Sequence, residues 1–231
     1  WVAQITPEGE DVSLGNMYVG TIHGFCLAKI REFWPDIYHN YDILDEAARA
    51  ALILRSFTNL LGLKKLQNEI GLGQYATLEK FIQAYDQLHE HDRFQVDLPL
   101  GTPPIALGGE EKDWCKKAVL LTDVGDSSEA RAFAVSAARY YAYLRCRRFL
   151  DFSTSQTEFI ENLRTDPKKY REIKETGIHL VVDEVQDINP VQRALIELLS
   201  GENGKLTTVG DHRQSIYGFR GAKVEIIAEL W

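Results

Sequence analysis

The spacing of apolar residues predicts helices through much of the first 150 residues. β-forming residues at 17–22 predict a short strand, and from His23 apolar residues recur every three or four positions until Pro35 interrupts the pattern. A second helix is predicted to begin after Asp45, a favourable N-cap residue, and to end just before Gly62. The chain is therefore expected to open with a strand that is followed by helices.

The helical pattern continues on both sides of a segment rich in proline and glycine. Thr77 is a predicted N-cap, whereas residues 97–111 contain several prolines and glycines and are predicted to form a loop. A long helix is predicted over 128–150, and its last turns carry Arg139, Arg145, Arg147 and Arg148. Two interpretations of these arginines stay open: cations placed favourably at a helix C-terminus, or a patch that faces phosphate groups.

The last eighty residues change to an alternation of strands and helices. Ser155 and Glu158 have the spacing of a capping box at a helix start. The apolar run at 178–182 predicts a strand that is buried on both faces. The other predicted elements are a strand at 206–209 and helices at 167–177, 190–199 and 224–230. This alternation predicts an α/β fold with a parallel sheet.

Composition and charge narrow the class of protein. The 231 residues carry 34 acidic and 26 basic side chains, a net charge of −8, which disfavours a protein that coats nucleic acid through bulk positive charge. A local basic groove remains compatible with that charge. No apolar run approaches the ~20 residues that cross a bilayer. Cys26, Cys115 and Cys146 are widely spaced and form no CxxC pair, which predicts reduced thiols in a cytosolic protein.

The first candidate for chemistry is the acidic pair Asp183 and Glu184, which follows the apolar strand. The carboxyl ends of parallel strands form the edge of the sheet where ligands bind, so both carboxylates are expected there. Because successive side chains diverge, one carboxylate can hold Mg²⁺, which prefers oxygen ligands, while the other orients and deprotonates a water. On its own, such a pair does not establish catalysis.

The second candidate is the segment 210–222, which follows the next predicted strand. Its polar and aromatic residues are, in order, Asp211, Gln214, Tyr217, Phe219 and Arg220. Gln214 can sense a phosphate oxygen or a water, and two aromatic rings beside an arginine suit stacking on unpaired bases. The alternative is a hydrophobic turn with an exposed arginine.

Together these segments resemble the superfamily 1 DNA helicases of the UvrD/Rep/PcrA group. The family's DExQD motif is similar to residues 183–187, and its GDxxQSIYxFRGA motif is similar to residues 210–222. Its TFHS-type motif is similar to residues 21–24, and weaker likeness at 43–45 and 150–152 extends the resemblance over nearly the whole chain. The resemblance implies a RecA-like (P-loop NTPase) parallel sheet with a large, mainly α-helical insertion called 1B.

The resemblance also implies roles for the matching residues. Asp183 would coordinate Mg²⁺ on ATP, Glu184 would act as the base for the attacking water, and Gln214 would contact the γ-phosphate. ATP coupling would involve Gln186, Asp187 and Asp211, and DNA binding would involve Thr21, His23, Tyr217, Phe219 and Arg220. For His23 the alternative is a helix-start residue that only caps or packs.

The chain departs from the family pattern in two places. Asp151 and Phe152 are followed by Ser153, Thr154 and Ser155, so the further carboxylates of the family's DFDDL segment are missing and the usual role of that segment is in doubt. No phosphate-cradling GxxxxGK[ST] occurs in the sequence. The expectation is that the P-loop lies upstream of Trp1 and the second RecA-like domain lies downstream of Trp231.

The expected protein is an internal piece of a helicase, with residues 1–36 and 151–231 in the first RecA-like domain and residues 37–150 in the insertion. The intact protein would use Mg²⁺ and ATP to move 3′→5′ on single-stranded DNA and to unwind duplex junctions, in the cytoplasm or at a bacterial nucleoid. Repair or recombination proteins would bind the insertion, and the piece alone would be inactive. Two alternatives stay open: the helicase part of an AddA/RecB-type nuclease complex, and a non-catalytic module that binds single strands or a protein.

Overall fold

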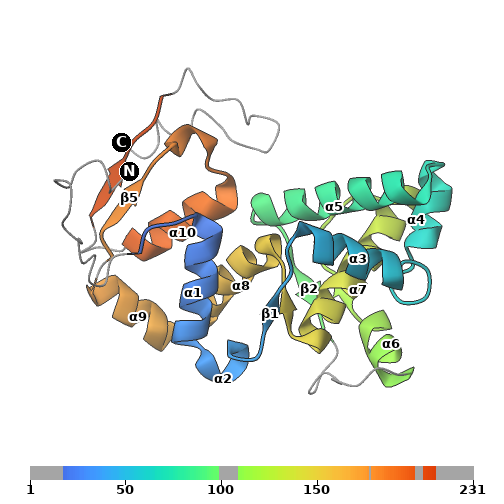
Figure 1. Cartoon of the computed structure of the whole chain (residues 1–231), viewed down its shortest axis with the longest axis horizontal. Helices are drawn as coiled ribbons and strands as arrows, with labels where there is room; N and C mark the ends of the chain where they lie inside the picture. The colour runs from blue at the N-terminus through green and yellow to red at the C-terminus, as the bar shows by residue number, and fades with distance from the viewer. Residues whose placement is uncertain (1–17, 99–108, 177, 201–204, 212–231) are drawn as a thin grey trace, which may run out of the picture.

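Two groups of helices and strands make up the structure, and helix α8 lies between them (Figure 1). The computed structural model describes residues 18–98, 109–176, 178–200 and 205–211. The first group contains α1 (Ile22–Phe33), α2 (Pro35–Tyr38), α9 (Pro167–Thr176), β5 (Leu180–Val182), the 3-10 helix η2 (Val185–Asp187), α10 (Pro190–Ser200) and β6 (Leu206–Thr208). The second group contains α3 (Glu46–Ser56), α4 (Leu63–Ile70), α5 (Gln74–Glu90), β2 (Val96–Asp97), α6 (Gly109–Lys116), β3 (Val119–Leu120) and α7 (Ser128–Arg147). They are joined through β1 (Asp42–Ile43), β4 (Phe149–Leu150) and α8 (Phe152–Thr165).

The first group is a mixed α/β unit built on a parallel pair of strands. β5 pairs with β6 in the register Leu180 to Leu206, Val181 to Thr207 and Val182 to Thr208, and α10 lies between them in the sequence. A strand, a helix and a parallel strand form a βαβ unit. Helices α1, α8, α9 and α10 share one apolar core with it. The predicted α/β class and parallel pairing are therefore confirmed for this part of the chain.

One feature predicted for β5 is wrong. Val181 is 77% exposed, so this strand is not buried on both faces. Side chains alternate along a strand, and Leu180 and Val182 face the small apolar cluster that contains Ile196. Val181 consequently projects from the opposite face.

The second group is helical and has a core of its own. Its helices pack around the fully buried rings of Phe81, Tyr85 and Tyr140, whose centroids lie 5.0–6.0 Å apart. The antiparallel pair β2–β3 joins Val96 to Leu120 in this group. The helical middle is thus as predicted, with α4 as an additional helix that the apolar pattern did not reveal.

The chain enters and leaves the helical group at adjacent positions. β1 pairs in parallel with β4, and the Asp42 N–H donates to the Arg148 carbonyl at 2.9 Å. The Leu44 N–H donates to the Leu150 carbonyl at 2.8 Å. Residues 149–150 belong to this pair, which is why α7 ends at Arg147 and not at the predicted position 150.

Local capping confirms several predicted helix boundaries. The Asp45 carboxylate accepts a hydrogen bond from the Ala48 N–H at 2.7 Å at the start of α3. Asn189 accepts one from the Gln192 N–H at 3.0 Å at the start of α10. Pro35 follows the end of α1 and is the first residue of α2, where its missing N–H costs nothing.

Other predicted boundaries are wrong. Residues 18–21 form no strand, because α1 already begins at Ile22 with Thr21 as its N-cap; Met17 lies outside the described residues. Gly73 is the N-cap of α5, and Thr77 lies inside that helix. Gly62 has φ 74° and precedes α4, so it does not end α3.

The predicted capping box at the start of α8 is displaced by one turn. Asp151 is the N-cap: its carboxylate accepts from the Thr154 N–H at 2.8 Å, and the Thr154 hydroxyl accepts from the Asp151 N–H at 3.0 Å. Ser155 and Glu158 therefore lie within the helix. Residues 99–108 of the predicted loop, Gly177 and the predicted helix at 224–230 lie outside the described residues.

The described part of the chain holds no helix that is both long and apolar enough to cross a membrane. All three cysteines are free, as the sequence predicts, and the structure shows that all three are buried. Burial raises the pKa of Cys26 to about 12.

Candidate functional site

Three acidic residues lie at the carboxyl end of the parallel pair β5–β6. Asp183 and Glu184 follow β5 directly, and two residues separate Asp211 from the end of β6. Because the strands are parallel and in register, these residues share one edge of the pair, where open α/β sheets bind ligands. The side chains of Asp183 and Glu184 are exposed and that of Asp211 is half-buried.

Glu184 adopts an unusual backbone conformation. Its φ of 53° and ψ of 42° lie in the left-handed region, which costs a residue with a Cβ about 1–2 kcal/mol. It precedes η2, and its N–H donates to the Asp183 carboxylate at 2.9 Å. Such strained backbone positions concentrate at functional sites.

Gln186 connects the two strand ends. Its side chain is buried, its Nε2 donates to the Glu184 carboxylate, and its Oε1 accepts from the Asp211 N–H at 3.1 Å. Backbone bonds reinforce the connection, because the Val185 N–H donates to the Val209 carbonyl at 3.1 Å. Asp187 is half-buried next to it, and its Oδ1 has no hydrogen-bond partner within the described ranges.

The oxygen donors at this edge fit a cation that is also held by a nucleotide. No group of three or more His, Cys, Asp and Glu side chains that could hold a metal occurs among the described residues. Mg²⁺ does not need one, since it commonly takes one or two carboxylates and completes its shell with phosphate oxygens and water. Exposed carboxylates such as those of Asp183 and Glu184 suit that arrangement.

Thr21 and His23 flank the start of α1. The Thr21 hydroxyl accepts a hydrogen bond from the Gly24 N–H at 3.1 Å, so it caps the helix. His23 is half-buried and contacts the Phe152 ring edge-on, with centroids 5.7 Å apart. Burial lowers the pKa of His23, and Asp86 offsets part of that effect.

Ile22 brings this segment close to the acidic edge. It packs both against the core of the first group and against the small cluster that contains Val185. The structure therefore places Thr21 and His23 on the element that borders η2. Gln214, Tyr217, Phe219 and Arg220 lie outside the described residues.

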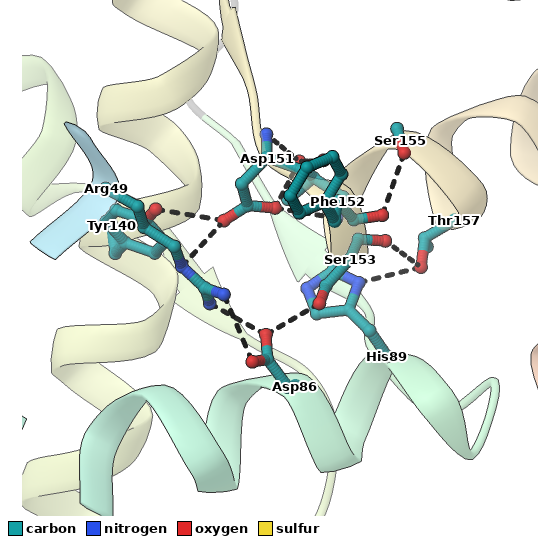
Figure 2. Close-up of polar contacts among 10 residues, drawn as sticks. Arg49, Asp86, His89, Tyr140, Asp151, Phe152, Ser153, Ser155 and Thr157 are labelled. Atoms are coloured by element: carbon teal, nitrogen blue, oxygen red, sulfur yellow. Dashed lines mark hydrogen bonds and ion pairs between the residues drawn. The ribbon is translucent and has the colours of Figure 1, made fainter. Parts of the chain in front are cut away.

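A buried polar cluster ties the helical group to the start of α8 (Figure 2). Arg49 donates to both carboxylate oxygens of Asp86, at 3.1 and 2.7 Å, and its Nε lies 3.2 Å from Asp151 Oδ2. Tyr140 donates to the same Asp151 oxygen at 2.9 Å, and Ser153 donates to Asp86 at 2.6 Å. Burial by itself raises the pKa of Asp151, but Arg49 and the hydrogen bonds hold it below its usual value.

Sequence reasoning did not identify this cluster. In the sequence, Arg49 and Asp86 resemble ordinary polar residues of amphipathic helices. Asp151 alone is marked there, by its likeness to the DFDDL segment. In the structure Asp151 is fully buried, caps α8 and pairs with Arg49, so its contacts are with the protein itself.

The arginines at the end of α7 are also paired with carboxylates. Arg145 lies 2.6 Å from Glu158, and Arg147 lies 2.7 Å from Glu111; both carboxylates are buried. A phosphate-facing patch is therefore wrong for these two arginines. Their position near a helix C-terminus is as predicted, but tertiary ion pairs hold them there.

Comparison with known proteins gives one family. Residues 3–230 match the model of the UvrD/REP helicase N-terminal domain. The chain is 42% identical over 91 residues to DNA helicase II of Escherichia coli (strain K12), covering 38% of this chain and 13% of that protein. It is 44% identical over 93 residues to the ATP-dependent DNA helicase Rep of Buchnera aphidicola, covering 39% and 14%.

A third relative is an ATP-dependent helicase/nuclease subunit from Carboxydothermus hydrogenoformans, 38% identical over 93 residues, covering 40% of this chain and 8% of that protein. The matched segments thus span only 8 to 14% of these relatives. The family model, in contrast, covers almost every residue. By that match the chain belongs to the UvrD/REP helicase family and corresponds to the N-terminal domain of its members.

Proposed function

We propose that this chain is part of an ATP-dependent DNA helicase, which couples hydrolysis of Mg²⁺-bound ATP to 3′→5′ movement along single-stranded DNA and to unwinding of duplex junctions. The observation that carries the proposal is the pair of exposed carboxylates, Asp183 and Glu184, at the carboxyl edge of a parallel strand pair. Membership of a helicase family and the names of the relatives, which include ATP-dependent DNA helicases, support it.

In this proposal the two carboxylates have different tasks. Asp183 would provide an oxygen ligand for the Mg²⁺ that accompanies ATP, and that cation would neutralise charge on the phosphates. Glu184 orients the attacking water and accepts its proton, for which an exposed carboxylate at the sheet edge is suitably placed. Gln214 contacts the γ-phosphate, while Gln186, Asp187 and Asp211 couple the two motifs.

The proposed DNA contacts lie on α1 and in the segment after Asp211. Thr21 and His23 face the DNA backbone; the Thr21 hydroxyl, which accepts from Gly24, still has a proton to donate to a phosphate. Tyr217 and Phe219 stack on unpaired bases and Arg220 supports the strand. The packing of Ile22 against the cluster of Val185 supports a link between these contacts and the acidic edge.

We further propose that the two groups are the first RecA-like domain, in two parts, and the 1B insertion. The two apolar cores support this division: one comprises buried residues from 44 to 146, and the other comprises residues 26–41 with residues 150–199. Tyr38 and Tyr41 pack in the core of the first group, which favours an insertion that begins near Asp42, a few residues after position 37.

A helicase component of a helicase/nuclease complex is a second candidate. The match to the helicase/nuclease protein of Carboxydothermus hydrogenoformans favours it. Both candidate functions use the same acidic edge. A nuclease domain in the complete protein would favour the helicase/nuclease complex over the helicase alone.

Substitution of Glu184 by Gln in the intact protein tests the proposal. The change keeps the shape of the side chain and removes its basic oxygen, so single-strand-stimulated ATP hydrolysis at saturating ATP should fall by about 10²–10⁴-fold. Binding of a fluorescent ATP analogue should be retained.

Glu197→Gln is the matched control, because Glu197 is an exposed glutamate on α10 that pairs with Arg193. It should leave hydrolysis unchanged. A loss below about threefold in Glu184→Gln would show that Glu184 is not the base.

A further inference from the structure

The helical group contains a cavity to which the proposed function assigns no task. It has a volume of about 300 Å³ and lies between α4, α5 and the start of α7 (Figure 1). Most of its lining is apolar and comprises Leu66, Ile70, Phe81, Ala84, Val124 and Phe133. The exposed side chains of Lys80, Ser127 and Glu129 also line it, so the cavity reaches the surface of the molecule.

The short helix α4 leaves this cavity open. Leu66 is buried, but Ile70, the last residue of the helix, is only half-buried. The helix ends there because Gly71, with φ 67°, is its C-cap. An apolar hollow between helices with polar residues around its opening is typical of a site that binds a partner.

The loop before α7 gives one side of the opening a negative charge. Asp123 and Asp126 each adjoin a residue that lines the cavity, and Glu129 lines it directly. All three carboxylates are exposed, and in the part of the chain that the structure describes none of them forms an ion pair. Among the described residues that line the cavity, Lys80 is the only basic one. The opening is therefore acidic overall.

We propose that this cavity docks a segment of a partner protein in which lysine or arginine flanks one bulky apolar side chain. Ligand pockets span about 300–1,000 Å³, so a cavity at the lower end of that range suits a single large side chain. The cations that complement the loop must lie outside the cavity, and neighbouring residues of one peptide provide both groups. DNA is a poor occupant, because the three carboxylates repel its phosphates.

The two parts of this surface should contribute to binding in different ways. A bulky side chain that fills a desolvated pocket carries much of the affinity of an interface. Charges at the rim mainly raise the association rate, and salt screens their effect. The inference goes beyond the proposed function and does not depend on the acidic edge of β5–β6.

Selection from a library of random short peptides on the immobilised 231-residue chain provides the probe. The enriched peptides should share an aromatic residue or leucine that is flanked by lysine or arginine. The most enriched peptide is then synthesised with a fluorescent label, and its Kd is measured by anisotropy. Alanine in place of its apolar anchor should weaken binding by at least about tenfold.

Ala84→Phe tests the cavity itself, because the added ring occupies the space of the anchor. The Kd of the labelled peptide should rise by at least about tenfold. Gln83→Phe is the matched control: Gln83 is the exposed neighbour on α5 and does not line the cavity, so binding should be unchanged. Urea unfolding of both variants shows whether they fold like the wild type.

Replacement of Asp126 and Glu129 by lysine tests the acidic loop. Binding should weaken by about tenfold at low salt, mainly through slower association, and the difference should nearly vanish in ~1 M salt, where the Debye length is about 3 Å. The same replacement of Asp36 and Glu46, which are exposed in the first turns of α2 and α3, is the control. It changes the net charge equally and should leave binding unchanged.

The inference is overturned if the enriched peptides share no such pattern, or if Ala84→Phe folds and binds the peptide like the wild type. It is also overturned if duplex DNA displaces the peptide, since the surface then binds nucleic acid. Sedimentation of the wild type as a dimer that Ala84→Phe dissociates would show that a second copy of the chain fills the cavity. Should Ala84→Phe unfold, the salt dependence of the lysine variant decides.

Discussion

His89, at the end of α5, is enclosed between the rings of Phe94 and Tyr85, whose centroids lie 4.0 and 4.6 Å from its own. Its Nδ1 lies 2.7 Å from the Thr157 hydroxyl (Figure 2), and its Nε2 is buried without a hydrogen-bond partner in the described ranges. Burial lowers the pKa of His89 to about 3, which Asp151 only partly offsets. The imidazole is therefore neutral in the folded protein.

This histidine should destabilise the fold in mild acid. In the unfolded chain its pKa is about 6.5, so below that pH the unfolded state binds a proton that the folded state does not, and stability falls by about 1.4 kcal/mol per pH unit until the pH nears 3. Above pH ~6.5 the effect is absent. Between about pH 7.5 and pH 5, wild type should lose roughly 2 kcal/mol more unfolding free energy in urea than His89→Asn.

His91, the exposed C-cap residue of α5, serves as the control. His91→Asn should follow the wild-type pH dependence, because its ring is at the surface. Parallel profiles of wild type and His89→Asn would contradict the prediction.

At the scale of elements, α8 connects the two groups. Its first turns are polar in sequence yet buried, and the buried set comprises Ser153, Thr154, Ser155, Gln156, Thr157, Glu158, Phe159, Ile160 and Leu163. Asp151 at its start pairs with Arg49 of α3, and Glu158 pairs with Arg145 of α7. On the side of α8 that faces the helical group, polar contacts therefore take the place of the apolar side chains that a helix between two cores would otherwise bury there.

Arg49→Met should strongly destabilise the protein. The methionine retains an apolar stem, but Asp86 and the fully buried Asp151 lose their cation, and breaking a buried ion pair typically costs about 3–5 kcal/mol. The unfolding free energy in urea measures the loss.

Arg164→Met provides the comparison at the other end of α8. Arg164 pairs with Asp92 at 2.6 Å, but its side chain is 41% exposed. Such pairs contribute about 0–1 kcal/mol, so its loss should be small. Equal losses in the two variants would show that burial of the Arg49 cluster is not the source of its stability.

At the scale of the whole molecule, the acidic edge and the helical group are parts of one connected structure. The chain passes between the two groups at β1 and again at β4, and these two strands pair with each other. α8 starts directly after β4, and the edge of β5–β6 lies in the first group (Figure 1). The described residues thus place carboxylates at the edge where open α/β sheets bind ligands. The sequence contains no GxxxxGK[ST] to hold phosphates.

The 231-residue chain by itself should therefore show almost no ATP hydrolysis. Carboxylates can hold the metal, but backbone amides and a lysine are needed to bind the phosphates. Phosphate release with single-stranded DNA present is the measurement. Turnover in the usual enzymatic range of about 1–10³ s⁻¹, abolished by Asp183→Ala, would contradict this expectation.

Features encoded within a few neighbouring residues were determined by the sequence alone. The caps at Asp45 and Asn189, the long helix α7, the strands β5 and β6, and the acidic pair after β5 are of this kind. Each depends on local hydrogen bonds or on side-chain periodicity, which the order of residues already contains. At Thr77 and Ser155, where another nearby residue could also cap the helix, the N-cap predicted from the sequence was wrong.

Tertiary structure decided which polar residues are buried and with whom they pair. Arg49 meets Asp151, and Gln186 meets Asp211, across separations that no periodicity expresses. A buried polar group is stable only when its partners arrive from other elements, so its environment depends on how those elements pack. The same packing turned Arg145 and Arg147 of α7 toward buried carboxylates and left Val181 exposed.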